Sequence, residues 1–176
     1  NRAHATDSLS RCIQVYDDAF STAMCEKMIQ SFHSLERFQR QNGRGIRPGH
    51  DDSGWTELNL DPLSDAAFRV MILENMHRHA ELYNQALNLP IAVPMTDKTS
   101  ELVMKRYKTS GAEGFQLHFD SIGEKANRYL VFLWYLNDVP EGGGTEFPEL
   151  GVTVQAKAGR LVIFPPYWMY QHIGQQ

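Results

Sequence analysis

Apolar residues recur at helical spacing in two stretches of the first half of the chain. The first stretch covers residues 21–40, and its apolar positions are three or four residues apart: Met24, Met28, Phe32 and Leu35. This spacing predicts an amphipathic helix. A second helix is predicted after Ser64, a candidate N-cap, and Asn88 and Pro90 mark its end. We expect the two helices to pack on one sheet.

Short apolar runs in the rest of the sequence predict strands rather than helices. Two of them lie in the first half, at 9–16 and 55–60. The others follow Pro94 at close spacing: 101–107, 115–120, 129–136, 151–156, 161–164 and 168–172. Many short strands separated by Gly- and Pro-containing turns are typical of a sandwich or jelly roll. The run 129–136 is apolar almost throughout, so we expect it to be a central strand.

Residues 41–54 separate the first helix from the strand at 55–60, and they follow neither period. The segment is rich in Gly, Asn, Asp and Pro and contains two Arg. Such composition predicts a loop. Loops of this length in compact domains are often lids or binding loops, so we expect a mobile segment that could close over a ligand.

Composition and charge narrow the classes of protein that fit. A length of 176 residues suits one domain, and 17 basic against 21 acidic residues give a net charge of −4. Because no basic stripe stands out, nucleic acid is not an expected partner. No apolar run approaches the roughly 20 residues of a membrane span, and we expect a cytoplasmic protein whose Cys12 and Cys25 are reduced. The oligomeric state is not indicated.

One short stretch places metal-binding side chains on an apolar strand. His118 and Asp120 are two residues apart, so a strand directs both side chains to one face. His172 follows another apolar strand late in the chain and is the candidate third ligand. Two His and one carboxylate form the facial triad of non-haem Fe(II) oxygenases, which leaves coordination positions open for a cosubstrate and dioxygen. We therefore predict an iron site.

The same pattern occurs a second time, at His50-Asp51-Asp52. That copy lies among Gly and Pro residues in the predicted loop, and no apolar neighbours fix its geometry. We interpret it as part of the loop rather than as a metal site.

Further segments around His118 occur in the order found in a known family. They are Tyr107 with Gly111, His118-Phe119-Asp120, Tyr135-Leu136-Asn137, the turn 142–147, and the strand from Gly159 to Pro165 that precedes His172. Over residues 101–172 the chain resembles the catalytic domain of the prolyl 4-hydroxylases, Fe(II)- and 2-oxoglutarate-dependent dioxygenases. The resemblance implies an α+β, mainly β fold: a double-stranded β-helix, or jelly roll, with two N-terminal helices packed on one sheet.

The resemblance also implies the roles of individual residues. His118, Asp120 and His172 would hold Fe(II), to which 2-oxoglutarate and then O2 would bind, and ascorbate is a possible further cofactor. Tyr107 and Tyr135 would hydrogen-bond 2-oxoglutarate, with Thr145 beside its far carboxylate. For Tyr135, core packing with the hydroxyl satisfied elsewhere is the alternative.

One part of the family pattern is missing from the sequence. The family places a Lys or Arg about ten residues beyond the distal His, where it pairs with the C5 carboxylate of 2-oxoglutarate. We therefore expect residues 1–176 to form a single domain that lacks its C-terminal strand, and the protein to continue past Gln176 to this cation. The candidate substitutes within the sequence are Lys105, Arg106, Arg128 and Arg160.

The usual target in this family is a prolyl residue in a peptide or protein, hydroxylated with release of succinate and CO2. We expect the loop 41–54 to fold over such a chain and Tyr167 and Trp168 to line its groove, unless these two pack in the core. Three alternatives remain: a hydroxylase of another side chain or a free amino acid, a non-catalytic cupin-like metal-binding domain, and a purely structural β-sandwich.

Overall fold

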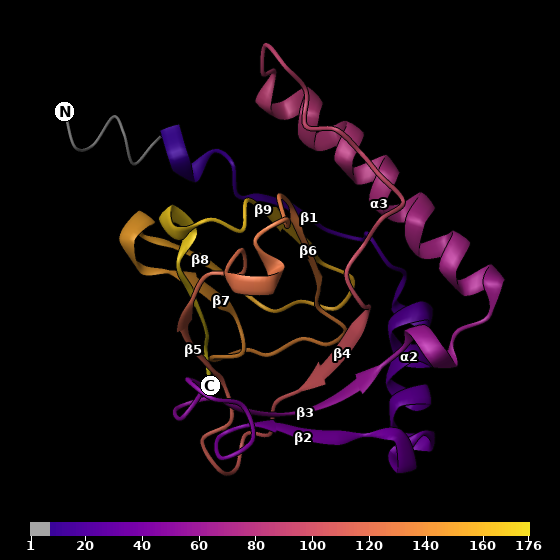
Figure 1. Ribbon diagram of the computed structural model, residues 1–176. Helices are drawn as coiled ribbons and strands as arrows, with labels where there is room; N and C mark the ends of the chain where they lie inside the picture. Colours follow the sequence, from indigo (N-terminus) through magenta and orange to yellow (C-terminus); the bar gives the residue numbers. More distant parts are fainter. Residues whose placement is uncertain (1–7) are drawn as a thin grey trace.

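The computed structural model describes residues 8–176 and contains three antiparallel sheets flanked by two long helices (Figure 1). The first sheet has the order β1 (Gln14–Tyr16), β9 (Leu161–Phe164) and β6 (Val131–Trp134). The second has the order β5 (Phe115–His118), β10 (His172–Gly174), β7 (Thr145–Phe147) and β8 (Val152–Val154). The third is formed by β2 (Arg40–Gly43), β3 (Gly54–Asn59) and β4 (Val103–Arg106).

Strand β9 is the centre of the first sheet, and all four of its residues are buried. Its side chains alternate between two clusters, as a strand requires. Leu161 and Ile163 join one cluster, whereas Val162 and Phe164 join the other. The prediction that 129–136 is the central strand is wrong, because β6 pairs only with β9 and lies at the edge of this sheet. All residues of β9 are buried and those of β6 are half-buried, so both strands are apolar in sequence and the apolar run alone does not show which is central.

The second sheet differs from the prediction in two of its strands, β10 and β7. Residues 168–172 were expected to be a strand, but Trp168–Tyr170 is a 3-10 helix and the strand begins at His172. Pro165 and Pro166 stand just before this helix and have no N–H to donate to a ladder. Strand β7 was not predicted, because it follows directly on glycines that indicated only a turn.

Helix α2 spans Thr22–Ser34, and Ser21 caps it by accepting a 3.1 Å hydrogen bond from the Met24 N–H. It is shorter than predicted: a 3-10 turn at Glu36–Phe38 and strand β2 occupy the rest of the expected helix and the start of the expected loop. The buried face of α2 packs on Leu58 of β3, so this helix covers the third sheet.

Helix α3 spans Ala66–Leu87. The residue that caps it is Asp65, which accepts from the Phe68 N–H at 2.8 Å, so the prediction of Ser64 is wrong by one position. Asn88, in a left-handed conformation, ends the helix as predicted. The last turns of α3 pack on β9 through Tyr83 and Leu87. Ile72 of α3 also belongs to the cluster that contains Leu58 and the buried face of α2, so both helices contact the third sheet, and α3 extends from it to β9.

The loop between β2 and β3 is held in place by one side chain of β5. Gln116 donates from Nε2 to the Gly49 carbonyl at 3.0 Å, and its Oε1 accepts from the Asp52 N–H at 3.0 Å and the Ser53 hydroxyl at 3.3 Å. Gly43 begins this loop at φ +95°, where an added Cβ would lie 2.3 Å from the Ser53 carbonyl oxygen. The loop is thus shorter than predicted and is anchored beside β5.

Gln116→Ala is expected to release this loop. Three hydrogen bonds of about 1 kcal/mol net each are lost, although water replaces part of them, so local opening should become easier by about 2 kcal/mol. Trypsin cleavage after Arg44 should then accelerate by about 30-fold, since cleavage of a transiently open loop follows its open population. Gln30→Ala, on the exposed face of α2, is the matched control. Unchanged cleavage would contradict the anchoring role.

Other expectations concern the chain as a whole. Cys12 and Cys25 are free thiols, as predicted. Residues 9–16 form a strand only at 14–16, and residues 8–10 are helical. Within residues 8–176 no helix combines the length and the apolar character that crossing a membrane needs. The single domain over residues 1–176 stays a prediction, and its residues 1–7 lie outside the part described.

Candidate metal centre

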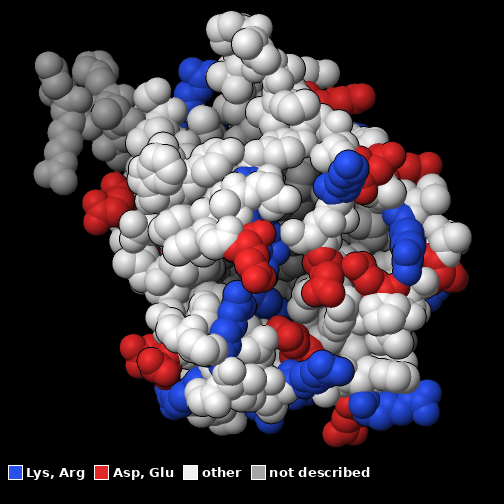
Figure 2. Space-filling view, viewed as in Figure 1, with Lys and Arg blue, Asp and Glu red and all other residues white. Residues whose placement is uncertain are grey.

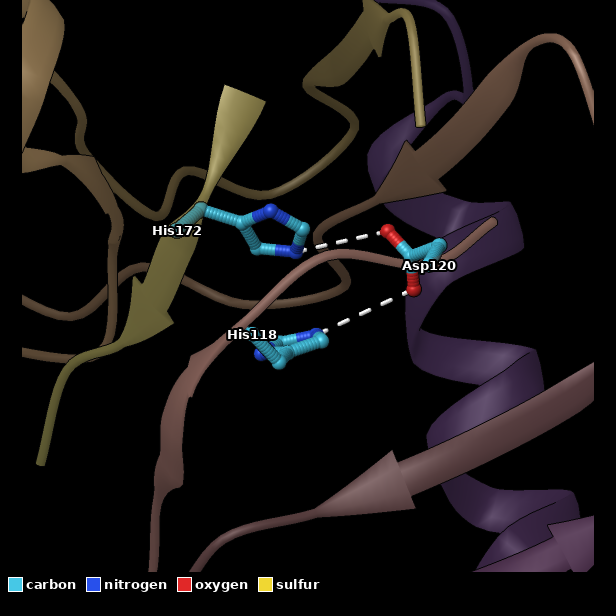
Figure 3. Close-up of side chains that lie close together, drawn as sticks. All are labelled: His118, Asp120 and His172. Atoms are coloured by element: carbon cyan, nitrogen blue, oxygen red, sulfur yellow. Dashed lines mark ion pairs between the residues drawn. The ribbon is translucent and has the colours of Figure 1, made fainter. Parts of the chain in front are cut away.

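The three predicted ligands meet at the junction of β5 and β10. His118 ends β5, Asp120 follows two residues later, and His172 begins β10. The two strands pair in antiparallel orientation with His118 directly opposite His172. One potential ligand atom of each residue lies within 4.8 Å of the other two, and the three side chains point toward one common space (Figure 3).

Backbone carbonyls fix the orientation of both imidazole rings. The Nδ1–H of His118 donates to the Gln116 carbonyl at 2.8 Å, and the Nδ1–H of His172 donates to the Tyr170 carbonyl at 3.0 Å. Each ring therefore directs its Nε2 toward Asp120, at 3.8 Å from Oδ1 for His118 and 3.5 Å from Oδ2 for His172 (Figure 3). A hydrogen bond from Nδ1–H to a carbonyl leaves Nε2 unprotonated and able to bind a metal.

Asp120 provides the observation that tests whether a cation fits. Its backbone N–H donates to the Pro166 carbonyl at 3.1 Å, which places the residue just beyond the end of β5. Its buried Oδ2 has no hydrogen-bond donor among the residues described. A buried carboxylate oxygen without a partner is unfavourable. A divalent cation between Asp120 and the two Nε2 atoms would satisfy it, and two His with one carboxylate suit Fe(II).

The protonation of the histidines also suits a metal. Burial lowers the pKa of His118 to about 4, and the nearby His172 lowers it further, against the opposing effect of Asp120. Burial likewise lowers the pKa of His172. Both imidazoles are therefore neutral at pH 7, so that a metal does not have to displace protons from them.

The metal-free protein is expected to lose stability in acid. His118 has a folded-state pKa of about 4 and an unfolded-state pKa near 6.5, so its contribution is complete above pH 6.5 and is lost as the pH falls toward 4. At pH 5 the loss should be about 2 kcal/mol. Urea unfolding at pH 7.5 and pH 5, repeated with His118→Gln, measures this difference. Equal midpoints for the wild-type protein at both pH values would contradict the assignment.

Aromatic rings surround the centre in a continuous series. The Phe115 ring lies 4.7 Å from Trp55 and 3.9 Å from His118, and the two histidine rings are 4.2 Å apart. Beyond His172 the series continues with Phe164 at 4.9 Å and Phe147 at 5.4 Å. The metal centre thus has two sides, a Phe115 side toward the third sheet and a His172 side toward β7 and β9.

The centre faces an open cavity of about 1980 Å³. Figure 2 shows a hollow near the middle of this face of the molecule, with Lys and Arg beside it and acidic groups close by. Tyr107, Tyr135 and Thr145 all line the cavity. The Tyr135 hydroxyl is 2.6 Å from Thr145 Oγ1 and donates to the Val154 carbonyl at 3.4 Å. Burial raises the pKa of Tyr107 and of Tyr135, so both remain neutral hydrogen-bond donors.

The comparisons with known proteins agree with this geometry. Residues 102–176 match the family model described as the 2OG-Fe(II) oxygenase superfamily. This segment contains His118, Asp120 and His172. The chain is also 32% identical to prolyl 4-hydroxylase subunit alpha-2 of Gallus gallus, over 78 residues that make up 40% of this chain and 14% of the chicken protein.

Two solved structures are similar to the chain over nearly its whole length. A Pseudomonas putida prolyl-4-hydroxylase has a TM-score of 0.65 at 18% identity, with 99% of this chain and 91% of that chain covered. The viral collagen prolyl hydroxylase of Paramecium Bursaria Chlorella virus-1, solved as its 2OG complex, has a TM-score of 0.59 at 18% identity, covering 93% and 87%. At this identity the likeness establishes a shared fold, mostly sheet with few helices.

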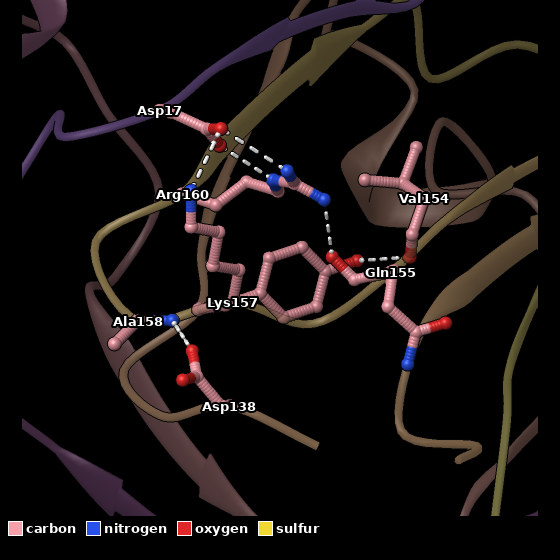
Figure 4. Close-up of polar contacts among 8 residues, drawn as sticks. Asp17, Asp138, Val154, Gln155, Lys157, Ala158 and Arg160 are labelled. Atoms are coloured by element: carbon pink, nitrogen blue, oxygen red, sulfur yellow. Dashed lines mark hydrogen bonds and ion pairs between the residues drawn. The ribbon is translucent and has the colours of Figure 1, made fainter. Parts of the chain in front are cut away.

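Three of the four cations that the sequence offers as substitutes have partners in the structure. Arg160 forms an ion pair with Asp17 at 2.7 Å, as Figure 4 shows, and this contact with Lys157 nearby lowers the pKa of Asp17 to about 2. Arg106 donates to Thr56 at 3.2 Å on the α2 side of its sheet. Arg128 donates to the Ser100 hydroxyl at 3.0 Å. Lys105 alone of the four faces the cavity without such a partner.

Some sequence-based assignments near the cavity need correction. Neither Tyr167 nor Trp168 lines the cavity, and Trp168 is 65% exposed on its 3-10 helix. His50 is outside the triad, as expected, but its ring packs edge-on against Phe115 at 5.2 Å, so the loop reaches the centre. Glu57 of β3 was not predicted to lie at the site but lines the cavity; its position two residues from Trp55 on this strand is the only sequence signal for it.

Proposed function

We propose that the chain is an Fe(II)- and 2-oxoglutarate-dependent dioxygenase that hydroxylates a prolyl residue in a peptide or protein, with release of succinate and CO2. The observation that carries the proposal is the partnerless Asp120 oxygen facing two oriented Nε2 atoms at the floor of an open cavity. The superfamily match over the segment that contains all three residues supports it.

His118, Asp120 and His172 are the proposed iron ligands. When bound, the iron would couple the oxidative decarboxylation of 2-oxoglutarate by O2 to hydroxylation of the substrate, chemistry that no side chain performs alone. The contribution of the protein is to hold three ligands on one face and to leave the opposite face open to the cavity. Ascorbate is the proposed reductant that keeps the iron in its ferrous state.

Tyr107, Tyr135 and Thr145 are the proposed contacts of 2-oxoglutarate. Thr145 lies on β7, opposite Gly174 of β10, so the Tyr135–Thr145 pair is on the His172 side of the centre. Neutral hydroxyl groups in a partly desolvated cavity can donate to a carboxylate of the cosubstrate. The direct Tyr135–Thr145 hydrogen bond means that the two hydroxyls would have to share or exchange a partner when 2-oxoglutarate binds.

For the fold, we propose that the first and second sheets face each other as a double-stranded β-helix within one domain. Their order, β1-β9-β6 and β5-β10-β7-β8, and their antiparallel pairing support this arrangement. The cluster of Phe147, Val162 and Phe164 joins the two sheets.

The choice of a prolyl substrate is supported by the names of three similar proteins, all of which are prolyl hydroxylases. The experiment is to incubate the protein with Fe(II), 2-oxoglutarate, ascorbate and a library of proline-containing peptides in air. We expect succinate and a peptide that gains the mass of one oxygen atom at proline. An oxygen on another side chain, or on a free amino acid, would favour the alternative hydroxylase.

The negative outcome is equally informative. Iron binding without succinate formation in any of these mixtures would support a non-catalytic metal-binding domain instead. As a control, Fe(II) and 2-oxoglutarate are added together without oxygen, because their complex with the protein absorbs visible light before turnover begins.

A further inference from the structure

One wall of the cavity carries Lys105, whose ammonium group forms no ion pair with any residue in the described range 8–176. Strand β4 alternates its side chains: Met104 joins the core beneath α2, whereas Lys105 is directed into the cavity. The Lys105 Nζ lies 4.7 Å from the centre of the Trp55 ring and 4.6 Å from that of Phe115. These two rings hold the ammonium group on the Phe115 side of the metal centre.

The nearest acidic residue on this wall is already engaged. Glu57 stands opposite Lys105 in the β3–β4 register, but its Oε1 accepts from Asn42 at 3.0 Å and its Oε2 accepts from the Trp55 indole at 2.7 Å. Among the described residues no hydrogen bond or ion pair within 4.0 Å is made by Lys105. Its three N–H groups therefore remain available to a ligand.

Neighbouring charges give this part of the cavity a positive character. Burial lowers the pKa of Lys105 to about 8; Glu57 and Asp120 oppose that shift, and Arg47 and Lys125 add to it. The lysine is therefore mostly protonated at pH 7. Arg47 lies in the loop fastened by Gln116, and Lys125 ends the 3-10 helix Gly123–Lys125, so three separate segments bring cations to one region of the lining. The Lys105 side chain is exposed to the cavity, so its ammonium group can pair with an anion that enters there.

We propose that Lys105 binds a carboxylate of the primary substrate, so that the oxygenase selects peptides with Asp or Glu close to the residue it hydroxylates. This inference rests on the proposed function and names the class of its substrate. Arg47 and Lys125 would favour the approach of such an acidic peptide at longer range.

The order of the rings indicates which carboxylate Lys105 meets. Lys105 contacts Phe115, which packs on His118, whereas the Tyr135–Thr145 pair lies beyond His172 on the other side of the centre. If 2-oxoglutarate occupies the His172 side, the molecule on the Phe115 side is the substrate. A carboxylate at Lys105 then belongs to the substrate rather than to 2-oxoglutarate.

The test compares Lys105→Met with the wild-type protein. Methionine keeps the length and apolar contacts of the side chain and removes its charge, and Lys27→Met on the exposed face of α2 is the matched control. Binding is measured by calorimetry without oxygen, with Mn(II) and 2-oxoglutarate present. The peptides have a central proline, with Glu or Gln at each flanking position.

We expect the wild-type protein and Lys27→Met to prefer Glu peptides over their Gln partners by at least about tenfold, the size of one charge-assisted contact. In Lys105→Met this preference should disappear while binding of Gln peptides and of 2-oxoglutarate is unchanged. The melting temperature of the metal-free variant should not fall, since an unpaired cation has been removed.

Two results would overturn the inference. One is a wild-type protein that shows no preference for Glu at any position; the other is a loss of 2-oxoglutarate binding in Lys105→Met, which would assign the lysine to the cosubstrate. Failure of the proposed function has a different signature: Glu-selective binding that depends on Lys105, without any peptide gaining oxygen in air. Hydroxylation with equal use of Glu and Gln peptides would reject the inference alone.

Discussion

His172→Ala is expected to lower the affinity for Fe(II) by more than about 100-fold and to abolish succinate formation. Loss of a residue that merely orients a ligand already weakens metal binding by about 10- to 100-fold, so loss of a ligand should exceed that range. The two remaining ligands, His118 and Asp120, come from one short segment and would leave the metal exposed to competing water. Anaerobic titration with Fe(II), followed by succinate measurement in air, gives both quantities.

The control for this prediction is His33→Ala, because His33 is exposed on α2 and outside the triad. The melting temperature of each variant should be recorded, since His172 is buried against aromatic rings and its removal leaves a small cavity. Iron affinity within about twofold of the wild-type value, in a folded His172→Ala protein, would exclude this residue as a ligand.

The triad could be predicted because its geometry depends mostly on local periodicity. A strand places His118 and Asp120 on one face wherever it lies in the fold. The return of His172 to the same place depends on the pairing of β10 with β5, which the sequence alone does not specify. The position of His172 after a late apolar strand made it a candidate ligand, and the ordered motifs of a known family supported that choice with information about topology that periodicity lacks.

The errors in the predicted fold also arise because strand pairing and helix packing depend on contacts between distant parts of the chain. The apolar run 129–136 resembles a central strand, yet its place at a sheet edge depends on long-range pairing with β9. Likewise, the two amphipathic helices show which of their faces are buried but not which sheet buries them. The role of Lys105 was only partly visible, because its exposure to the cavity depends on the β3–β4 register and on the ring of Phe115.

Phe164→Ala is expected to destabilise the protein by about 3 to 5 kcal/mol, the usual effect of removing a buried phenyl ring from a core. Phe164 is 0% exposed, and its ring packs edge-on against Phe147 at 5.0 Å and against His172 at 4.9 Å. Because β9 contributes this ring to the cluster that contains Phe147 of β7, the cavity left by alanine would lie directly beside His172, the proposed metal ligand. Urea unfolding of the metal-free protein measures the change in free energy.

Phe164→Ala should also weaken metal binding, an effect that is not expected of a core substitution far from the metal centre. A ligand whose ring is no longer held by its packing should lose about tenfold in metal affinity, as with other supporting contacts.

Phe164→Leu keeps most of the volume and should recover most of the stability, so that the remaining loss of affinity reports the ring contact with His172. Phe38→Ala, at a side chain that is 41% exposed, should change neither quantity. If Phe164→Ala lowered stability but left Fe(II) affinity unchanged, the orientation of His172 would depend on its hydrogen bond to the Tyr170 carbonyl alone.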